Sequence, residues 1–385
     1  MIRPLALIVG AGVAGLTAAW WLDRAGWRSI IVERTLDLHD GGYMMGLSGQ
    51  GYATACRMGL EPALLAAQVA IDENVYRDRR GRDIVRLRYR DFLRDTPYVA
   101  IMRTDLVRLL HDALPASSAI RFGTTLTAID PRDAGVRARL SDGTDVSADM
   151  LIAADGVRSA TRQLAFGDSH GRLEPLGYRF AVYDLTSDAA LDADFVSFVE
   201  PGHMAEYYRI GDRRLAALHV WQNDVAERAT GVAAWEELAA VTTRSHIRVR
   251  DTLASARTSG VPVLADGLLM ADMPSWSRGR ILLLGDAAHC LTLVSGQGGG
   301  LSMASAERLG RALETGDAAR ALAAHEALLR PAVSRLQHRA RGSARMFVPA
   351  TPAGFAVRNA VMRAIPPAWL GRYLSSTIRT EIALV

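Results

Sequence analysis

The chain contains no lysine, and each of its 45 Lys-plus-Arg residues is an arginine. This absence excludes reactions that need a lysine amine: Schiff-base formation, proton abstraction by a lysine and phosphate binding by the lysine of a P-loop. Cysteine is scarce as well. The two cysteines, Cys56 and Cys290, fit a reducing compartment, and we expect no disulfide between them.

Long apolar runs and strong net charge are also missing. No stretch approaches about 18 consecutive apolar residues, and the first residues lead into a strand pattern without a cleavable signal. We therefore predict a cytoplasmic protein without stable membrane association. The net charge of +4 is too small to indicate nucleic-acid binding, and the arginines are too dispersed along the chain. No group of His, Cys, Asp and Glu has metal-ligand spacing, so we expect no metal site.

Glycines near the start of the chain carry the first motif. An apolar run at 5–9 is followed by GAGVAG and by apolar residues at helical spacing over 13–26, and 29–33 reads as a second buried strand. This β-α-β pattern with GxGxxG predicts a site for the diphosphate of a dinucleotide at the helix N-terminus. An acidic residue that ends the second strand would accept the ribose hydroxyls. The candidate cofactor-binding residues here are Gly10, Gly12, Val13, Ala14, Gly15, Glu33 and Arg34.

The 385 residues exceed one comfortable core, so we expect two domains or one domain with a large insertion. The pattern predicts an α/β fold in which a nucleotide-binding domain is interrupted by a mixed β-sheet domain and completed by C-terminal helices. We predict helices at 103–114, 233–256 and about 298–314, short strands with a turn at Asp142-Gly143, an antiparallel sheet within 174–224 and a buried strand at 279–287.

Three motifs occur in one order: GAGVAG at 10–15, DGVRSATR at 155–162 and GDAAH at 285–289. With them the sequence resembles the single-component (group A) FAD-dependent aromatic hydroxylases, the para-hydroxybenzoate hydroxylase-like flavoprotein monooxygenases, over roughly residues 1–330. The resemblance implies a glutathione-reductase-type FAD-binding Rossmann domain. It also implies that both glycine-rich loops hold one non-covalent FAD, the first loop at the adenosine diphosphate and the second at the ribityl chain and flavin ring.

On this resemblance the chain divides into three parts. The FAD-binding domain is discontinuous and comprises 1–70, 100–170 and 267–330. The substrate-binding domain comprises 71–99 and 171–266, and 331–385 forms a C-terminal helical segment.

The second glycine-rich loop supplies the remaining cofactor candidates. Asp286 follows a buried strand, where a carboxylate can accept hydrogen bonds from ribityl hydroxyls. Glycines before the next helix would turn free amides and the positive helix end toward the flavin pyrimidine, which stabilises reduced flavin. The stretch 291–294 lacks the prolines that the family often has there, and it resembles the antibiotic-tailoring or tetracycline-inactivating branch. These loop candidates are Gly296, Gly298, Gly299, Gly300 and Leu301.

Other roles come from the resemblance alone. It implies that Arg103 reaches the FAD phosphate and ribityl region, and that the backbone of Leu126 meets the adenine. Asp155 and Arg158 would help both FAD and a transiently bound nicotinamide. His289 and Cys290 invite a catalytic or covalent-flavin interpretation, but a histidine in this motif commonly plays a supporting part in the family, and we expect no covalent attachment.

The resemblance implies a monooxygenase that uses NADPH or NADH and O2 to hydroxylate an electron-rich aromatic, polycyclic or polyketide-like substrate through a C4a-hydroperoxyflavin. No second GxGxxG offers the nicotinamide cofactor a Rossmann domain of its own. The protein would position substrate, exclude water and protonate the departing oxygen. No catalytic residue is identified; His219 and Tyr207 are candidates. Aromatic candidates for the pocket floor are Tyr183, Tyr207, Tyr208 and Trp221.

Several alternatives share these motifs. A flavin-dependent halogenase would need a lysine and usually a WxWxxI stretch, and the chain has neither. A Baeyer–Villiger oxygenase, a flavin oxidase or reductase, and a non-catalytic FAD-binding partner protein stay open. Substrate-stimulated NADPH consumption separates the hydroxylase from the non-catalytic partner, and product analysis separates the enzymes. The sequence specifies no oligomeric state.

The C-terminal stretch at 353–376 is a basic amphipathic segment broken at Pro366-Pro367. It could lie on a membrane surface or pack on the protein's own domains. Only two arginines, Arg358 and Arg363, precede the prolines, and about 1 kcal/mol each near an anionic surface would not hold the protein there. We therefore predict packing on the protein's own domains.

Overall fold

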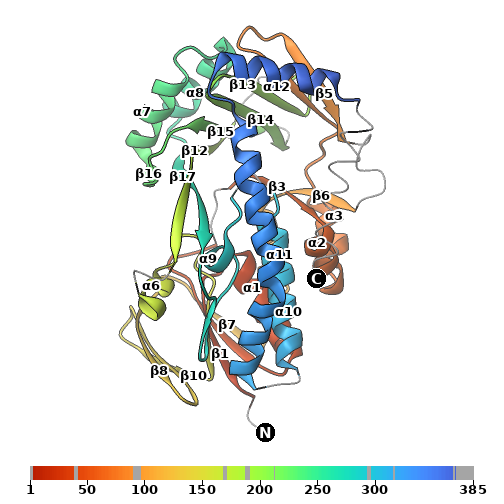
Figure 1. The fold of residues 1–385 in the computed structure, drawn as a ribbon. Helices are drawn as coiled ribbons and strands as arrows, with labels where there is room; N and C mark the ends of the chain where they lie inside the picture. The colour runs from red at the N-terminus through yellow and green to blue at the C-terminus, as the bar shows by residue number, and fades with distance from the viewer. Residues whose placement is uncertain are drawn as a thin grey trace.

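The computed structural model describes residues 3–38, 42–89, 97–167, 171–186, 191–211, 213–292, 296–314, 317–366 and 369, without the side chains of 343–347. Two bodies lie end to end, a parallel-sheet domain near the N-terminus and an eight-stranded sheet at the opposite end (Figure 1). Helix α11 (Ala318–Phe347) runs from the first body to the second, and α12 (Pro352–Ala364) crosses the second.

The parallel-sheet domain is built on a six-stranded sheet with strand order β18-β19-β11-β1-β2-β7. Its central strands are parallel, and the short β18 at the edge is antiparallel to β19. The strands are β1 (Leu5–Val9), β2 (Arg28–Val32), β7 (Ser118–Arg121), β11 (Met150–Ala153), β18 (Ser277–Arg278) and β19 (Ile281–Leu283). The predicted β-α-β unit is confirmed, with α1 (Val13–Arg24) between β1 and β2.

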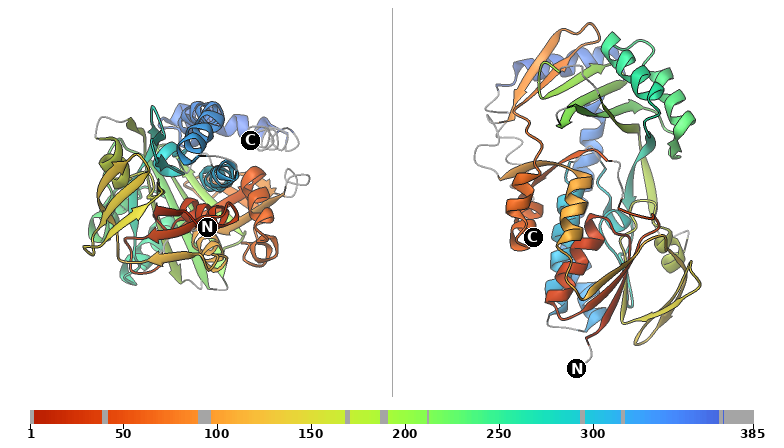
Figure 2. Two further views of the ribbon diagram at one scale, coloured as in Figure 1. Left: turned by 90° about the horizontal axis from the view of Figure 1, so that it is seen from below. Right: turned by 180° about the vertical axis from the view of Figure 1, so that it is seen from behind.

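Helices cover one face of this sheet and a small sheet covers the other (Figure 2). Ala6 and Ile8 of β1 pack with helices, whereas Leu7 and Val9 pack toward the small sheet, because successive strand residues point to opposite faces. The helices are α1, α5 (Arg103–Asp112) and α10 (Gly298–Leu313), and α6 (Ala160–Phe166) packs beside the small sheet. The small sheet comprises β8 (Leu126–Arg132), β9 (Gly135–Leu140) and β10 (Asp145–Ala148), and its β9–β10 turn contains Gly143 as predicted.

The eight-stranded sheet has the order β16-β17-β12-β15-β14-β13-β4-β5, antiparallel except for the parallel pair of β13 and β4. Its strands are β4 (Glu73–Arg77), β5 (Asp83–Arg88), β12 (Arg172–Thr186), β13 (Phe195–Glu200), β14 (His203–Gly211), β15 (Arg214–Gln222), β16 (Ala229–Thr230) and β17 (Leu264–Asp272). Helices α7 (Gly231–Val241) and α8 (Ile247–Thr258) cover one face, which we call the covered face. The helical patterns predicted within 233–256 thus form two helices.

Strands β12 and β17 join the two bodies. Leu173 and Ala271 pack in the core of the parallel-sheet domain, whereas Ala181 and Ala265, farther along the same strands, pack beneath α7 and α8. The boundary predicted at 266/267 thus falls inside a continuous strand. The division of the chain into domains stays a prediction.

The second face of the large sheet, which we call the inner face, looks toward the parallel-sheet domain. The Met44 amide donates a 2.7 Å hydrogen bond to the Tyr208 hydroxyl on this face. Met44 lies on β3 (Met44–Ser48), which pairs with β6 (Tyr98–Met102), and β3 leads into α2 (Gly49–Arg57) and then α3 (Glu61–Ala66). Strand β3 therefore links the inner face to the core of the parallel-sheet domain, in which Met45 and Leu47 pack.

Helix α12 lies against the large sheet. Phe355 packs with the apolar cluster that includes Tyr178 and Met204, and Arg363 Nε donates to the carbonyl of Ile84 on β5 at 3.2 Å. The helix thus packs on the protein's own sheet, as the packing alternative predicts. Within the ranges that the structure describes, no helix is long and apolar enough to cross a membrane.

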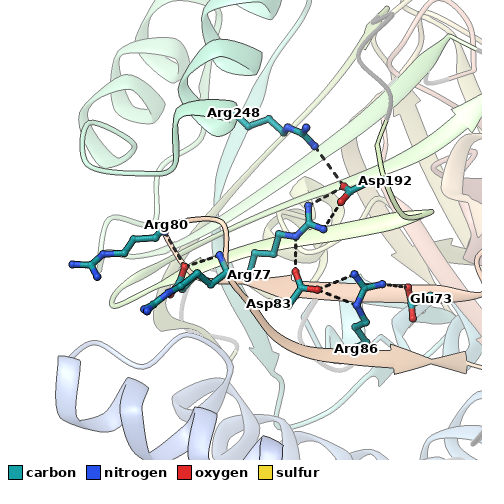
Figure 3. A network of polar contacts seen from close by, with 9 residues as sticks. Glu73, Arg77, Arg80, Asp83, Arg86, Asp192 and Arg248 are labelled. Atoms are coloured by element: carbon teal, nitrogen blue, oxygen red, sulfur yellow. Dashed lines mark hydrogen bonds and ion pairs between the residues drawn. The ribbon is translucent and has the colours of Figure 1, made fainter.

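The arginine-rich hairpin of β4 and β5 is held by carboxylates (Figure 3). Arg77 contacts Asp192 at 2.5 Å and Asp83 at 2.9 Å, and Asp192 also faces Arg248 of α8 at 3.6 Å. Arg86 joins Asp83 to Glu73, the first residue of β4. These ion pairs fasten the hairpin to α8 and to the segment before β13.

This network predicts a specific acid dependence of stability. The hydrogen bond from Arg77 lowers the pKa of Asp192 to about 2, below its unfolded value of about 4. The stabilisation is therefore fully present above pH ~4 and is lost as the pH falls toward ~2. Because the Asp192 side chain is 54% exposed, we expect Asp192→Asn to lower the free energy of unfolding by only about 0.5–1 kcal/mol at pH 7.

Urea unfolding of wild type and Asp192→Asn between pH 7 and pH 2 measures this effect. The two curves should converge at the acid end. Asp130→Asn, which alters an exposed ion pair with Arg132, is the control and should show a smaller difference. A difference for Asp192→Asn that stays constant across the range would contradict the assignment.

Candidate active site

The first glycine loop lies too close to its neighbours to carry side chains. Gly10 has φ +107°, and a Cβ there would lie 2.5 Å from the carbonyl oxygen of Ala154 on the neighbouring strand. A Cβ on Gly15 would lie 2.0 Å from the Gly10 oxygen, so α1 approaches β1 only because that residue is glycine. Gly12 caps α1, and Val13 and Ala14 form its first turn with free amides. This geometry is the cradle that GxGxxG predicts.

Glu33 is fixed beside this loop at the end of β2. Its Oε2 accepts a hydrogen bond from the Ala11 amide at 2.9 Å, and its Oε1 accepts from the amide and hydroxyl of Thr35, each at 3.0 Å. The Thr124 amide donates to the Glu33 carbonyl, which brings the start of β8, with buried Leu126, close to the same edge. Arg34 is exposed at this edge.

These contacts define a test of the role of Glu33 in FAD binding. We expect Glu33→Ala to weaken FAD binding by about 1.5–3 kcal/mol, because charge-assisted bonds to the ribose and the anchor of the Ala11 amide are lost together. Glu33→Gln keeps the shape and should lose less. Fluorescence titration of the apoprotein with FAD measures both affinities. Unchanged affinity in Glu33→Ala would remove Glu33 from the adenosine site.

The second motif meets the first directly. Gly285 has φ +61°, and a Cβ there would lie 2.7 Å from the Ala14 Cβ, so the GD motif touches the first turn of α1. Asp286 begins the short α9 (Asp286–His289). A Cβ on Gly298, the first residue of α10, would lie 3.6 Å from Asp286 Oδ1. The two glycine-rich loops are thus neighbours across Ala14, although more than half the chain separates them.

Arg103 places a positive charge between the loops. Its Nη2 lies 4.0 Å from the position of a Cβ on Gly12. Burial raises the pKa of Asp286, and the Arg103 charge together with the Cys290 thiol opposes that rise. Burial also raises the pKa of Tyr43 to about 12, again opposed by Arg103. The Arg103 cation thus acts on both Asp286 and Tyr43 at the junction of the two loops.

Cys290 and His289 are not poised for chemistry. Burial, with the nearby Asp286, raises the pKa of the Cys290 thiol well above its usual range, so the nucleophilic thiolate is disfavoured. Cys290 and Cys56 are both free thiols. His289 is buried against the Trp276 ring at 4.9 Å, and burial lowers its pKa to about 3. Its neutral ring acts as a core side chain.

The start of α10 and the start of α2 meet at a hollow. A Cβ on Gly51 would lie 2.3 Å from Gly300 Cα, and one on Gly299 would lie 2.1 Å from Met45 Cε. Two helix N-termini therefore present amides to the same space. The hollow is lined by Gly46, Ser48, Gln50, Gly51, Gly296, Gln297, Gly300, Leu301, Ala304, Leu329, Ala332 and Leu336. Sequence reasoning found the α10 side and missed the β3–α2 side, whose signal is the small-residue run GLSGQG at 46–51.

The DG motif connects the loops through a residue that sequence reasoning missed. Arg162 is buried and donates to the carbonyls of Val157 at 2.9 Å and Ala287 at 3.0 Å, so it ties the DG motif to the GD motif. Asp155 lies beside Gly10 and accepts from the Thr161 amide at 3.0 Å. Arg158 instead pairs with Asp266 of β17, away from the glycine loops.

The aromatic candidates divide between the two faces of the large sheet. Tyr183, Tyr207 and Trp221 lie on the covered face, in the core beneath α7 and α8. Tyr208 alone of the four lies on the inner face. Tyr207 and Tyr208 are adjacent in β14, so strand alternation sends them to opposite sides. The pocket-floor interpretation therefore needs correction for the three on the covered face.

His219 lies in the same covered core. Its Nε2 is 3.1 Å from the Tyr183 hydroxyl and its Nδ1 is 3.2 Å from His203, whose other nitrogen contacts Glu200 at 3.0 Å. Burial lowers the pKa of His219 well below its usual value, so the ring is neutral. His219 and Tyr207 are thus internal partners of the covered core, without direct access from the inner face.

The residues at the two loops fit FAD. The glycine cradle has room for a diphosphate. Glu33 lies at the edge where the ribose would lie, and Asp286 and the amides of α10 lie where the ribityl chain and flavin ring would continue. Among the described residues no group of three or more His, Cys, Asp or Glu side chains is arranged to hold a metal. The fold and the site therefore define a flavoprotein of the glutathione-reductase type.

Comparison with known proteins gives the family. The FAD-binding domain family matches residues 5–330. The chain is 31% identical over 355 residues to 3-amino-4-hydroxybenzoate 2-monooxygenase of Streptomyces cremeus, covering 88% of this chain and 86% of that protein. The chain belongs to this FAD-binding domain family. It is one of the group A FAD-dependent hydroxylases, which are flavin-dependent monooxygenases.

Solved structures share the fold. The tetracycline destructase Tet(51) superposes with a TM-score of 0.81 at 22% identity, over 96% of this chain and 98% of that one. HpxO of Klebsiella pneumoniae, solved with FAD and uric acid, superposes with a TM-score of 0.83 at 22% identity, over 97% and 96% of the two chains.

Proposed function

We propose that this protein is an NAD(P)H-dependent FAD monooxygenase that hydroxylates an electron-rich aromatic or polycyclic small molecule. The observation that carries the proposal is the contact of the two glycine-rich loops across Ala14, beside Arg103 and Asp286, below the inner face of a second sheet. A site of this form suits one extended dinucleotide with its reactive end toward a separate substrate surface. The bound flavin supplies the chemistry with the nicotinamide hydride and O2.

The chain's own residues would hold that cofactor at both ends. Gly10, Gly12, Val13, Ala14 and Gly15 would take the diphosphate through backbone amides, with Glu33 and Arg34 at the adenosine edge. The backbone of Leu126 would meet the adenine, and Arg103, Asp155 and Asp286 would complete the middle of the site. Gly296, Gly298, Gly299, Gly300 and Leu301 would place amides against the flavin ring, where the positive ends of α2 and α10 favour negative charge.

The protein also has to shield the reacting atoms from water. Met44 and Tyr208 pack on the inner face in an apolar cluster with Phe195 and Ala216, which would exclude water above the cofactor. A dry surface disfavours loss of the activated oxygen as peroxide.

Consumption of NADPH and NADH by the FAD-loaded protein tests the proposal. Phenolic, indolic and polyketide compounds are added one at a time, and peroxide is measured beside the nicotinamide. We expect at least one compound to accelerate NAD(P)H consumption with less peroxide than nicotinamide consumed. Consumption that no compound accelerates, or that always ends as stoichiometric peroxide, would favour a binding partner or an oxidase instead.

A further inference from the structure

The inner face of the large sheet carries a buried acid for which the proposed function has given no role. Glu206 lies on β14 and is only 9% exposed. Its Oε1 is 3.4 Å from the Ser197 hydroxyl, the one hydrogen-bond partner of the carboxyl among the residues that the structure describes. Within those residues no arginine forms an ion pair with it.

Ser197 cannot satisfy this carboxyl. The Ser197 hydroxyl is fully buried and has one hydrogen to donate. Its oxygen also lies 3.1 Å from Asn74 Oδ1, to which it donates. Because the contact with Asn74 is the shorter one, Glu206 competes with Asn74 for the single hydroxyl hydrogen. A buried carboxyl with a shared, long hydrogen bond lacks donors, and this lack carries a free-energy cost that an incoming donor would relieve.

Three tyrosines lie near enough to the acid for its charge to act on them. Tyr76, Tyr89 and Tyr208 all feel the charge of Glu206, and burial raises the pKa of each tyrosine, so they stay neutral. Burial raises the pKa of Glu206 to about 7, and the Ser197 hydrogen bond opposes that rise. The charge of Arg358 on α12 acts on Tyr76 as well and opposes the rise of its pKa.

Two lines of contacts connect this acid to the cofactor loops. Tyr208 follows Glu206 by two residues on the same face, about 7 Å along the strand, and bonds the Met44 amide. The next residue, Met45, touches Gly299 at the flavin loop. Glu206 is therefore a short step along β14 from the place where the flavin ring would lie.

The second line runs through stacked rings. Tyr89 stacks on Tyr98 with ring centres 6.3 Å apart and an interplanar angle of 15°. A Cβ on Gly46 would lie 2.6 Å from the Tyr98 ring, and Gly46 lines the hollow between α2 and α10. The charge of Glu206 in turn helps to raise the pKa of Tyr89. We call the series that leads from Gly46 through Tyr98 and Tyr89 to Glu206 the wall.

We propose that Glu206, with Ser197 and Asn74, is the substrate-recognition end of this wall and selects aromatic substrates that present a hydroxyl, amide N–H or ammonium donor instead of a carboxylate. This inference rests on the proposed function. A donor on the substrate completes the hydrogen bonding of the acid, and a charge-assisted bond is the strongest form. A substrate carboxylate would bring a second negative charge into a buried site beside the Glu206 carboxyl.

Three phenols with one ring and one side-chain length test the selection. Tyramine ends in an ammonium group, 4-hydroxyphenylacetamide in an amide and 4-hydroxyphenylacetate in a carboxylate. Binding to the FAD-loaded full chain is measured at pH 8, above the Glu206 pKa, by flavin difference spectra and by calorimetry. We expect the ammonium and amide compounds to bind at least about tenfold more tightly than the carboxylate.

The variant Glu206→Gln keeps the shape and removes the charge. It should lose the preference for the ammonium and amide compounds over the carboxylate and bind the carboxylate better than wild type does. Glu200→Gln is the matched control, because Glu200 contacts His203 and Ser245 in the covered core. This control should retain the wild-type ranking.

Equal binding of carboxylate and ammonium by wild type, an unchanged ranking in Glu206→Gln, or no calorimetric binding of any of the three overturns the inference. Its failure is distinct from failure of the proposed function. A protein that consumes NAD(P)H in response to some aromatic compound, yet shows no charge ranking, contradicts the role of Glu206 alone. A ranking without any nicotinamide consumption contradicts the monooxygenase proposal alone.

Discussion

Replacing Gly10 by alanine should cost the protein its flavin and destabilise it by about 2–5 kcal/mol. Two effects add. The backbone has φ +107°, which an L side chain adopts only with strain, and the new Cβ would lie 2.5 Å from the Ala154 carbonyl oxygen. The backbone must move at the point where it should receive the diphosphate. Chemical denaturation measures the stability, and flavin absorbance of the purified protein measures retention.

Gly59→Ala separates the two effects. Gly59 has φ +78°, but a Cβ there meets nothing within 4 Å. This control should lose only the conformational part, about 1–2 kcal/mol, and keep its flavin. If Gly10→Ala and Gly59→Ala behave alike in stability and flavin content, close packing at Gly10 does not govern the site.

Replacing Arg162 by methionine has the second large expected effect. The guanidinium donates to two carbonyls, those of Val157 and Ala287, and its loss leaves buried acceptors unsatisfied. We expect a loss of about 2–5 kcal/mol in the free energy of unfolding, since an unsatisfied buried group costs about 1–3 kcal/mol. FAD affinity should fall as well, because the DG and GD motifs are no longer tied together. Methionine keeps much of the apolar stem.

Arg278→Met is the control for Arg162→Met. Arg278 also donates to a backbone carbonyl, that of Ala165 at 3.2 Å, but it is exposed and lies outside the three motifs. It should lose less than about 1 kcal/mol and keep wild-type FAD affinity. An Arg162→Met protein as stable and as strongly yellow as the Arg278→Met protein would show that the motifs hold their positions without this link.

Local patterns were sufficient for much of the fold. The run at 5–9, the helical spacing after it and the second strand gave β1, α1 and β2 within two residues, because each signal lies inside one short segment. The stretch 233–256 was predicted to be helical, but the pattern did not show where it divides. Its helical pattern continues across 242–245, where the Thr242 hydroxyl bonds the Leu238 carbonyl and the chain turns between α7 and α8. Hydrophobic periodicity does not report a side chain that competes for backbone hydrogen bonds, so it does not locate the end of a helix there.

Residues of the candidate site were predictable only where a short sequence motif fixes the local backbone geometry. The glycines and Glu33 follow from one β-α-β unit. Alternation alone could not say which of Tyr207 and Tyr208 faces the cofactor, because both faces of the large sheet are buried. Glu206 reads in the sequence as an ordinary strand charge, and the bond of Arg162 to Ala287 joins residues 125 positions apart. Such contacts arise from long-range packing, which no local pattern reports.

The most direct test of the proposed monooxygenase is the fate of isotopically labelled dioxygen. The FAD-loaded protein is given labelled O2, NADPH or NADH, and the compound that most accelerates nicotinamide consumption. Mass spectrometry then follows the organic product. We predict one labelled oxygen atom in a new hydroxyl group, with about one nicotinamide consumed for each product molecule. A product that carries no label, or label that is recovered only as hydrogen peroxide, would contradict the account.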